Sequence, residues 1–170
     1  FEEYGDHRDL HGVDRRQRQI CIIDRLKTAG YDSIFIHPHD LKFYNRNTLM
    51  PMMGFSQLLS PGPHNPTPDM PYFGDIALGR TLTDMMATAS KPSLFYAVTM
   101  ENHGPWPTDG DKQTPLRHYL RHVKNSDQML LNLIEDMSAG AAKALLIFFG
   151  DHRPSIPGLV TPSAVRDVPY

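Results

Sequence analysis

Three short apolar runs alternate along this chain with three longer segments in which apolar positions recur at a helical spacing. Apolar residues three and four positions apart predict helices, and short apolar runs bounded by glycine or proline predict buried strands. The predicted helices are 14–29, 74–86 and 117–138, and the predicted strands are 31–37, 94–100 and 145–149. This alternation predicts an α/β fold in which a mostly parallel sheet is flanked by helices.

The run at 145–149 is the most apolar of the three, and we expect it to be a central strand that is buried on both faces. It ends at Gly150, which permits a sharp turn, and Asp151 and His152 follow directly. Ligand sites in parallel sheets lie at the carboxyl ends of the strands. A carboxylate and an imidazole there can bind one metal ion, but a solvated strand end with two polar residues is an equal alternative.

A histidine follows each predicted strand. His37 and His103 come after the first two strands, and His152 comes after the third. Because parallel strands share one carboxyl edge, we expect these imidazoles to gather at a single rim of the sheet. Arg46, beside the aromatic Tyr44, can contact phosphate or sulfate oxygens in a bidentate manner, although a surface arginine paired with a nearby acid is the alternative. This set suits chemistry on a phosphoryl or sulfuryl group, with two histidines as donors and Arg46 as an anion clamp.

Composition and charge exclude several classes of protein. The net charge is −2 with histidine neutral, which provides no basic face for nucleic acid. Hydrophobic residues make up 40% of the chain, so it is not disordered by composition. No apolar run is long enough to span a bilayer, no signal peptide is visible, and no glycine-rich phosphate loop is present. The single cysteine, Cys21, excludes an internal disulfide, and we expect it to be a small core residue of the first helix.

We expect one domain that comprises residues 1–170, with 1–13 and 155–170 peripheral. Residues 1–12 mix histidine and aspartate, and there we expect a solvated terminal segment rather than a metal cluster. Since the chain starts at Phe1 rather than at a methionine, we also expect it to be a piece of a longer protein.

Three motifs in this sequence resemble those of a known family. They are HPHDLKFYNR at 37–46, followed by MGF at 53–55, then ENHGPW at 101–106 and FGDHRP at 149–154. In this order they resemble motifs of the lipoteichoic acid synthases and related phosphoglycerol transferases, which belong to the sulfatase branch of the alkaline phosphatase superfamily. The order and approximate spacing agree along most of 20–154.

The resemblance implies a partial alkaline phosphatase-like (sulfatase) domain that contains the C-terminal part of a catalytic site. Asp151 and His152 would bind a divalent metal ion, manganese or magnesium rather than zinc or calcium. The catalytic residues would be His103, Arg46 and His37.

The resemblance also implies a substrate and a location. Tyr44, Asn102 and Trp106 would contact the substrate, which would be a phosphate- or sulfate-bearing small molecule or glycan. The parent protein would be a membrane-anchored transferase or hydrolase of the cell envelope whose catalytic domain lies outside the cytoplasm. It would act on cell-surface glycans or glycerol-phosphate-type substrates, such as those of capsule polysaccharide.

One departure from the family limits what this chain can do. The family's threonine nucleophile (a modified Cys or Ser in true sulfatases) and one acidic metal ligand lie upstream of the matching motifs, and residues 1–19 do not reproduce them. Cys21 lacks the Cys-x-Pro-x-Arg context of a sulfatase nucleophile. We therefore expect the chain alone to be inactive and to bind divalent metal weakly. Two alternatives stay open: a non-catalytic relative that binds anionic glycans, and an unrelated cytosolic metal-binding protein.

Overall fold

The computed structural model describes residues 21–61, 66–67, 70–106, 114–140 and 142–156. The chain divides into two compact units. The first comprises Phe1–Pro61 and Met86–Val98, and the second comprises Gly62–Met85 and Thr99–Tyr170. The expectations for the two terminal segments, 1–13 and 155–170, fall largely outside the described residues.

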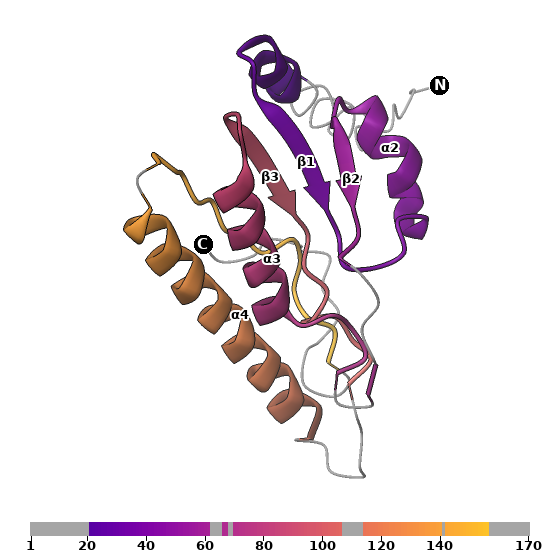
Figure 1. The fold of residues 1–170 in the computed structure, drawn as a ribbon. Helices are drawn as coiled ribbons and strands as arrows, with labels where there is room; N and C mark the ends of the chain where they lie inside the picture. Colours follow the sequence, from indigo (N-terminus) through magenta and orange to yellow (C-terminus); the bar gives the residue numbers. More distant parts are fainter. Residues whose placement is uncertain (1–20, 62–65, 68–69, 107–113, 141, 157–170) are drawn as a thin grey trace, which may run out of the picture. The chain divides into compact units, whose positions relative to one another are not determined.

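A three-stranded parallel sheet forms the centre of the first unit (Figure 1). Its strands are β1 (Asp32–Ile36), β2 (Gln57–Leu59) and β3 (Ser93–Ala97), in the order β2-β1-β3. β1 is parallel to both neighbours, which confirms the predicted α/β class and the parallel pairing of the first two predicted strands. β2 is not predicted from the sequence because three residues are too few to show a periodic pattern.

The core of the first unit is aromatic. The Phe35 ring lies 5.6 Å from the Phe55 ring and 5.9 Å from the Tyr96 ring, and Ile23 packs into the same cluster from helix 21–28. That helix ends as predicted at Gly30, whose φ of 83° is readily adopted only by glycine. The core therefore fixes β1 between its neighbours and orients the residues that follow the strand.

The segment after β1 contains two helical segments that the apolar pattern does not predict. They are η1 (Phe43–Asn45) and α2 (Arg46–Met52). Met50 and Met53 pack against the aromatic core, as expected for methionines that fill irregular gaps. This packing holds the short α2 helix in place although Pro51 lies inside it.

The expectation that Cys21 is a core residue is wrong, because its side chain is exposed. The buried residue of this helix is Ile23. Residues two positions apart in a helix point about 200° apart around its axis, so Cys21 faces solvent when Ile23 faces the core.

One helix and most of another dominate the second unit, and they confirm two of the predicted helices. They are α3 (Asp75–Thr88) and α4 (Thr114–Ala139), which lie side by side in Figure 1. A Cβ atom on Gly79 of α3 would lie only 2.7 Å from Cγ of Met129 on α4, so the glycine permits their close approach. Of the described helices, none is long and apolar enough to cross a membrane.

The buried face of α4 differs from the predicted apolar stripe. We expected the stripe to consist of Tyr119, Leu120, Val123, Leu130, Leu131, Ile134 and Met137. The buried residues at helical spacing are instead His122, Ser126, Met129 and Leu133. The polar members of this face are buried because they form hydrogen bonds to other parts of the unit, and a pattern of apolar residues alone cannot identify them.

The prediction that 145–149 is a buried central strand is wrong for this chain. The segment has no regular secondary structure, and the exposed fraction of its side chains runs from 37% at Leu146 to 83% at Leu145. A strand needs a neighbour that accepts and donates its backbone hydrogen bonds. Among the described residues, the named strand ladders join only β1, β2 and β3, so this apolar run has no partner there.

We predict that Phe35→Ala destabilises the chain by about 3–5 kcal/mol, because the substitution leaves a cavity in the aromatic core. Urea denaturation followed by circular dichroism measures this free energy of unfolding. Ile22→Ala is the matched control on an exposed position, and it should change the free energy by less than about 0.5 kcal/mol. Equal effects of the two substitutions would contradict the assigned core.

Candidate functional site

The carboxyl end of β1 places His37 between both neighbouring strands. The His37 backbone N–H donates to the carbonyl of Leu59 at the end of β2 (3.0 Å), and Val98 N–H donates to the carbonyl of Ile36 (2.9 Å). The His37 ring lies 2.9 Å through Nδ1 from the carbonyl of Val98, just after β3. Since a carbonyl can only accept, Nδ1 carries a proton. His37 thus ties the ends of all three strands together.

Burial keeps the His37 ring neutral, and the bond to Val98 fixes its tautomer. The side chain is fully buried, and burial, opposed by the bond to Val98, lowers its pKa to about 4. The charge of Arg46 lowers this pKa further. The ring is therefore neutral at pH 7 with its proton on Nδ1, which leaves Nε2 as an acceptor. The guanidinium of Arg46 donates to this Nε2 atom, so in this structure both ring nitrogens of His37 are engaged.

Two neighbouring aromatic rings, 4.4 Å apart, lie close to the guanidinium of Arg46. Its central carbon lies 5.9 Å from the centre of the Phe43 ring and 5.6 Å from that of Tyr44, within range of cation–π attraction. Tyr44 is 70% exposed. The structure therefore brings together three of the predicted site residues, His37, Tyr44 and Arg46.

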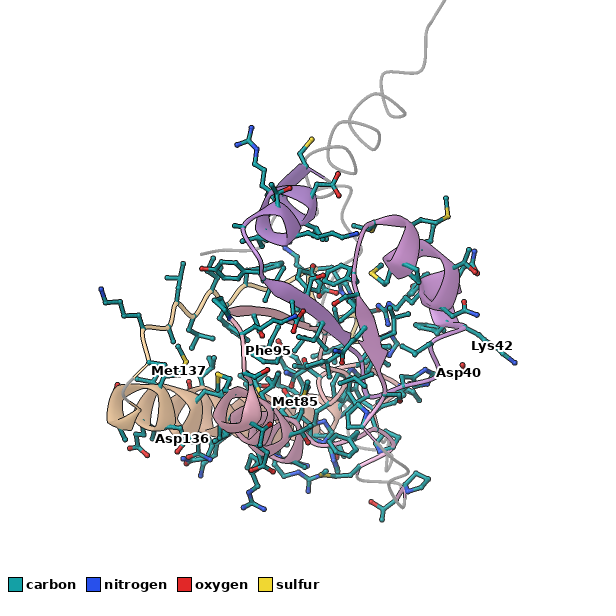
Figure 2. The ribbon with its side chains drawn as sticks, turned by 45° about the horizontal axis from the view of Figure 1, so that its top comes forward. Asp40, Lys42, Met85, Phe95, Asp136 and Met137 are labelled. Atoms are coloured by element: carbon teal, nitrogen blue, oxygen red, sulfur yellow. The ribbon has the colours of Figure 1, made fainter. Side chains whose placement is uncertain are left out.

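The backbone just before Arg46 is strained. Tyr44 and Asn45 both have φ of 53°, in the left-handed region that residues with a side chain rarely adopt. Such conformations cost roughly 1–3 kcal/mol each and concentrate at functional sites. The turn that leads into this segment carries Asp40 and Lys42, labelled in Figure 2, and the Asp40 carboxylate accepts the Lys42 N–H at 2.9 Å.

In the second unit, His103 lies on an exposed loop. Its Nδ1 atom lies 2.6 Å from the carbonyl of Gly104, so Nδ1 donates and Nε2 remains for another partner. The Tyr72 hydroxyl donates to the same carbonyl at 3.0 Å, and the Tyr72 ring lies edge-on to His103 at 5.6 Å. These contacts hold the exposed imidazole from one side.

The structure places Asn102 and Trp106, two predicted substrate-binding residues, toward the interior of this unit. Asn102 is half-buried and donates through Nδ2 to the Ser126 hydroxyl at 2.6 Å. Trp106 is buried, with its ring 5.4 Å from Tyr119 and 5.6 Å from His122. In this arrangement Trp106 anchors the loop that carries His103.

Asp151 and His152 provide the donor atoms expected for part of a metal site. His152 Nδ1 lies 2.9 Å from the carbonyl of Arg153, so it donates, and the remaining nitrogen Nε2 is free of a proton in the neutral ring. That Nε2 lies 3.7 Å from a carboxylate oxygen of Asp151, and both side chains are more than half exposed. The bond from Nδ1 to the Arg153 carbonyl orients the imidazole and leaves Nε2 to bind a metal ion. Within the described residues, no three His, Cys, Asp or Glu side chains are close enough together to hold an ion.

Three further residues of these regions are not among the predicted site residues. His39 lies 6.0 Å from the His37 ring and 5.2 Å from the Phe43 ring. Glu101 and Asp75 are fully buried acids in the second unit. The motif around His103 contains Glu101, but nothing in a sequence pattern shows that a carboxylate is buried.

Comparison with known proteins agrees with the motifs. The sequence profile of the Sulfatase family matches residues 2–166. The capsular polysaccharide biosynthesis protein RkpI from Rhizobium meliloti (strain 1021) is 33% identical over 144 residues, which cover 81% of this chain and 27% of RkpI.

Two solved structures share the fold. An alkaline phosphatase superfamily protein from Vibrio parahaemolyticus aligns with a TM-score of 0.53 at 23% identity, over 71% of this chain and 32% of that chain. The Streptococcus pyogenes phosphoglycerol transferase GacH, in complex with sn-glycerol-1-phosphate, aligns with a TM-score of 0.51 at 21% identity, over 64% and 33%. This chain thus spans about a quarter to a third of the length of these proteins. Because the family profile matches nearly all of its residues, the chain belongs to the Sulfatase family.

Proposed function

We propose that this chain is part of a metal-dependent transferase or hydrolase that acts on phosphoryl or sulfuryl groups of cell-surface glycans or glycerol-phosphate-type substrates. The observation that carries the proposal is the fixed guanidinium of Arg46, which a neutral, buried His37 holds at the carboxyl end of the sheet. A cation in that place suits tetrahedral oxyanions.

In this proposal Arg46 binds the anion and Tyr44 forms one wall beside it. His37 acts through Arg46, since its own two ring nitrogens are engaged. His103 contributes an exposed imidazole whose Nε2 atom can donate a proton to an anionic oxygen when the ring is charged. Asn102 and Trp106 hold the loop that carries His103, and neither presents an exposed surface to the substrate.

Asp151 and His152 would hold a divalent metal ion, together with ligands from outside this chain. A carboxylate oxygen and an imidazole nitrogen suit manganese, and magnesium is an alternative because it also accepts carboxylate oxygen. When bound, such an ion would supply Lewis-acid polarisation of a phosphoryl or sulfuryl oxygen. A nucleophile is expected outside the chain, and a protein that lacked one would be a non-catalytic module that binds anionic glycans.

The parent protein, in this proposal, contains the rest of the sulfatase domain and is a membrane-anchored protein of the cell envelope whose catalytic domain lies outside the cytoplasm. Two observations support a larger domain: the chain spans 27% of RkpI, and 145–149 exposes an apolar surface of the kind that proteins usually cover. The similarity to a capsular polysaccharide biosynthesis protein supports a role in surface polysaccharides.

We predict that Arg46→Ala in the intact protein weakens binding of inorganic phosphate or sulfate by about 10- to 100-fold, the value of a lost charge-assisted contact. The same substitution should lower the free energy of unfolding by about 1–3 kcal/mol, since it removes the Arg46 donor from a buried acceptor on His37. Isothermal titration and thermal unfolding measure the two effects, and Lys42→Ala is the control for loss of a nearby cation. A large loss of stability with unchanged anion binding would contradict the clamp.

We also predict that the 170-residue chain alone does not turn over 4-nitrophenyl phosphate and binds manganese weakly, because it contributes two metal ligands. In the intact protein, His152→Ala should weaken manganese binding by at least about 10-fold, whereas His118→Ala on α4 should leave it unchanged. Robust turnover by the isolated chain, or equal effects of the two histidine substitutions, would refute this part of the proposal.

A further inference from the structure

Glu101 lies at a junction of three parts of the second unit. It is fully buried and directly precedes Asn102 and His103. One carboxylate oxygen, Oε2, accepts the backbone N–H of Asp75 at 2.5 Å, and the other, Oε1, accepts from the Asn125 side chain on α4 at 2.5 Å. Each oxygen of the carboxylate thus receives a donor from a different helix.

The bond to Asp75 closes the N-terminus of α3. The Leu78 N–H donates to the carbonyl of Gly74, so Asp75 is the first residue inside the helix and its N–H has no partner within it. The carboxylate of Glu101 supplies that partner from a segment 26 positions along the chain. A negative charge at this end also interacts favourably with the helix dipole.

The backbone around Glu101 is held as well. His122 donates through Nδ1 to the carbonyl of Glu101 at 2.7 Å. The next residue, Asn102, donates to the Ser126 hydroxyl, which in turn donates to a carboxylate oxygen of Asp75 at 2.5 Å. Two consecutive residues before His103 are therefore fixed to both helices.

The burial of Asp75 near Glu101 disfavours the charged form of Asp75. Burial, and then the charge of Glu101, raise the pKa of Asp75 to about 6, while the bond from Ser126 lowers it in part. Within the part of the chain that the structure describes, the other charged or titratable group that faces Asp75 is His122. Two acids buried together destabilise a fold unless both find donors. Their presence beside an exposed loop therefore points to a role that core packing alone does not require.

We infer that Glu101 is a positioning residue: its carboxylate joins the N-terminus of α3 to α4 and thereby fixes the loop that presents His103. The inference rests on the proposed function, in which His103 contacts the anionic group of the substrate. It assigns no contact with the substrate to Glu101, because its side chain is buried and both of its oxygens are occupied.

The hydrogen bonds and burial of Asp75 lead to a separate prediction about the thermal stability of Asp75→Asn. Because the pKa of Asp75 is raised, the folded chain binds the Asp75 proton more tightly than the unfolded chain does. The protonated carboxyl group therefore stabilises the fold, and this stabilisation is lost as the pH rises from about 4 to about 6. Asparagine does not ionise, so the variant does not lose stability over this pH range. Its side-chain oxygen can still accept the hydrogen bond from Ser126. Thermal unfolding should show a higher midpoint for the variant at pH 8, with a difference that shrinks below about pH 5. Asp127→Asn, on an exposed position of α4, should show no such trend, and a pH-independent difference for Asp75→Asn would contradict the buried charge.

The inference about Glu101 is tested by a double-substitution cycle in the intact protein. Glu101→Ala should lower kcat/KM for a phosphate- or sulfate-ester substrate by about 10- to 100-fold, as expected when a catalytic group is displaced by about 1 Å. If Glu101 acts through His103, the double variant Glu101→Ala/His103→Ala should be no slower than His103→Ala alone. Glu101→Gln should retain activity within about threefold, because its oxygen can accept from Asp75 and its amide can donate to the Asn125 oxygen once that side chain turns over. Glu135→Ala is the control for loss of an exposed acid on α4.

The outcomes distinguish a failure of the proposed function from a failure of the positioning role. If His103→Ala leaves activity unchanged, the proposed function is wrong about His103 and the inference falls with it. If His103→Ala removes activity but Glu101→Ala does not, only the positioning role is wrong. Effects that multiply in the double variant, at a temperature where every variant is folded, would show that Glu101 acts through general stability and would overturn the inference.

Discussion

The position of Arg46, the proposed anion clamp, depends on the buried imidazole of His37. It continues the hydrogen bonding of the sheet beyond β1, and the bond to Val98 fixes which ring nitrogen holds the proton. A neutral ring with a free lone pair then holds the Arg46 guanidinium, whereas a charged ring would repel it. Desolvation keeps the ring neutral, so the same burial that positions His37 also makes it an acceptor for the cation.

In the second unit, buried carboxylates hold the residues that precede the His103 loop. Its reactive candidate, His103, lies on an exposed loop, and loops hold their geometry only when something anchors them. Here the anchors are hydrogen bonds from α4 and the N-terminus of α3 to the residues just before His103, and the packed ring of Trp106 just after it. Buried polar groups that find hydrogen-bond partners hold a structure in one arrangement.

The sequence predicts the elements of this fold better than it predicts their surroundings. The helices and the first two strands follow from apolar periodicity and from stops such as Gly30, because both depend on neighbours in sequence. The failures involve partners that are distant in sequence. The 145–149 run has the pattern of a central strand but no paired strand among the described residues, and the buried face of α4 includes His122 and Ser126 because other segments supply their hydrogen bonds. The motifs that contain the predicted site residues can be identified in the sequence. The neutral state of His37 and the inferred role of Glu101 depend on contacts that only the structure shows.

We propose that Arg46, His103, Asp151 and His152 act on one substrate group in the intact protein. The most direct measurement is a crystal structure of the intact protein soaked with manganese and phosphate. We expect manganese on Asp151 and His152, with phosphate oxygens in contact with the metal, Arg46 and His103. Manganese and phosphate bound elsewhere, or these side chains lying on separate surfaces, would contradict the account.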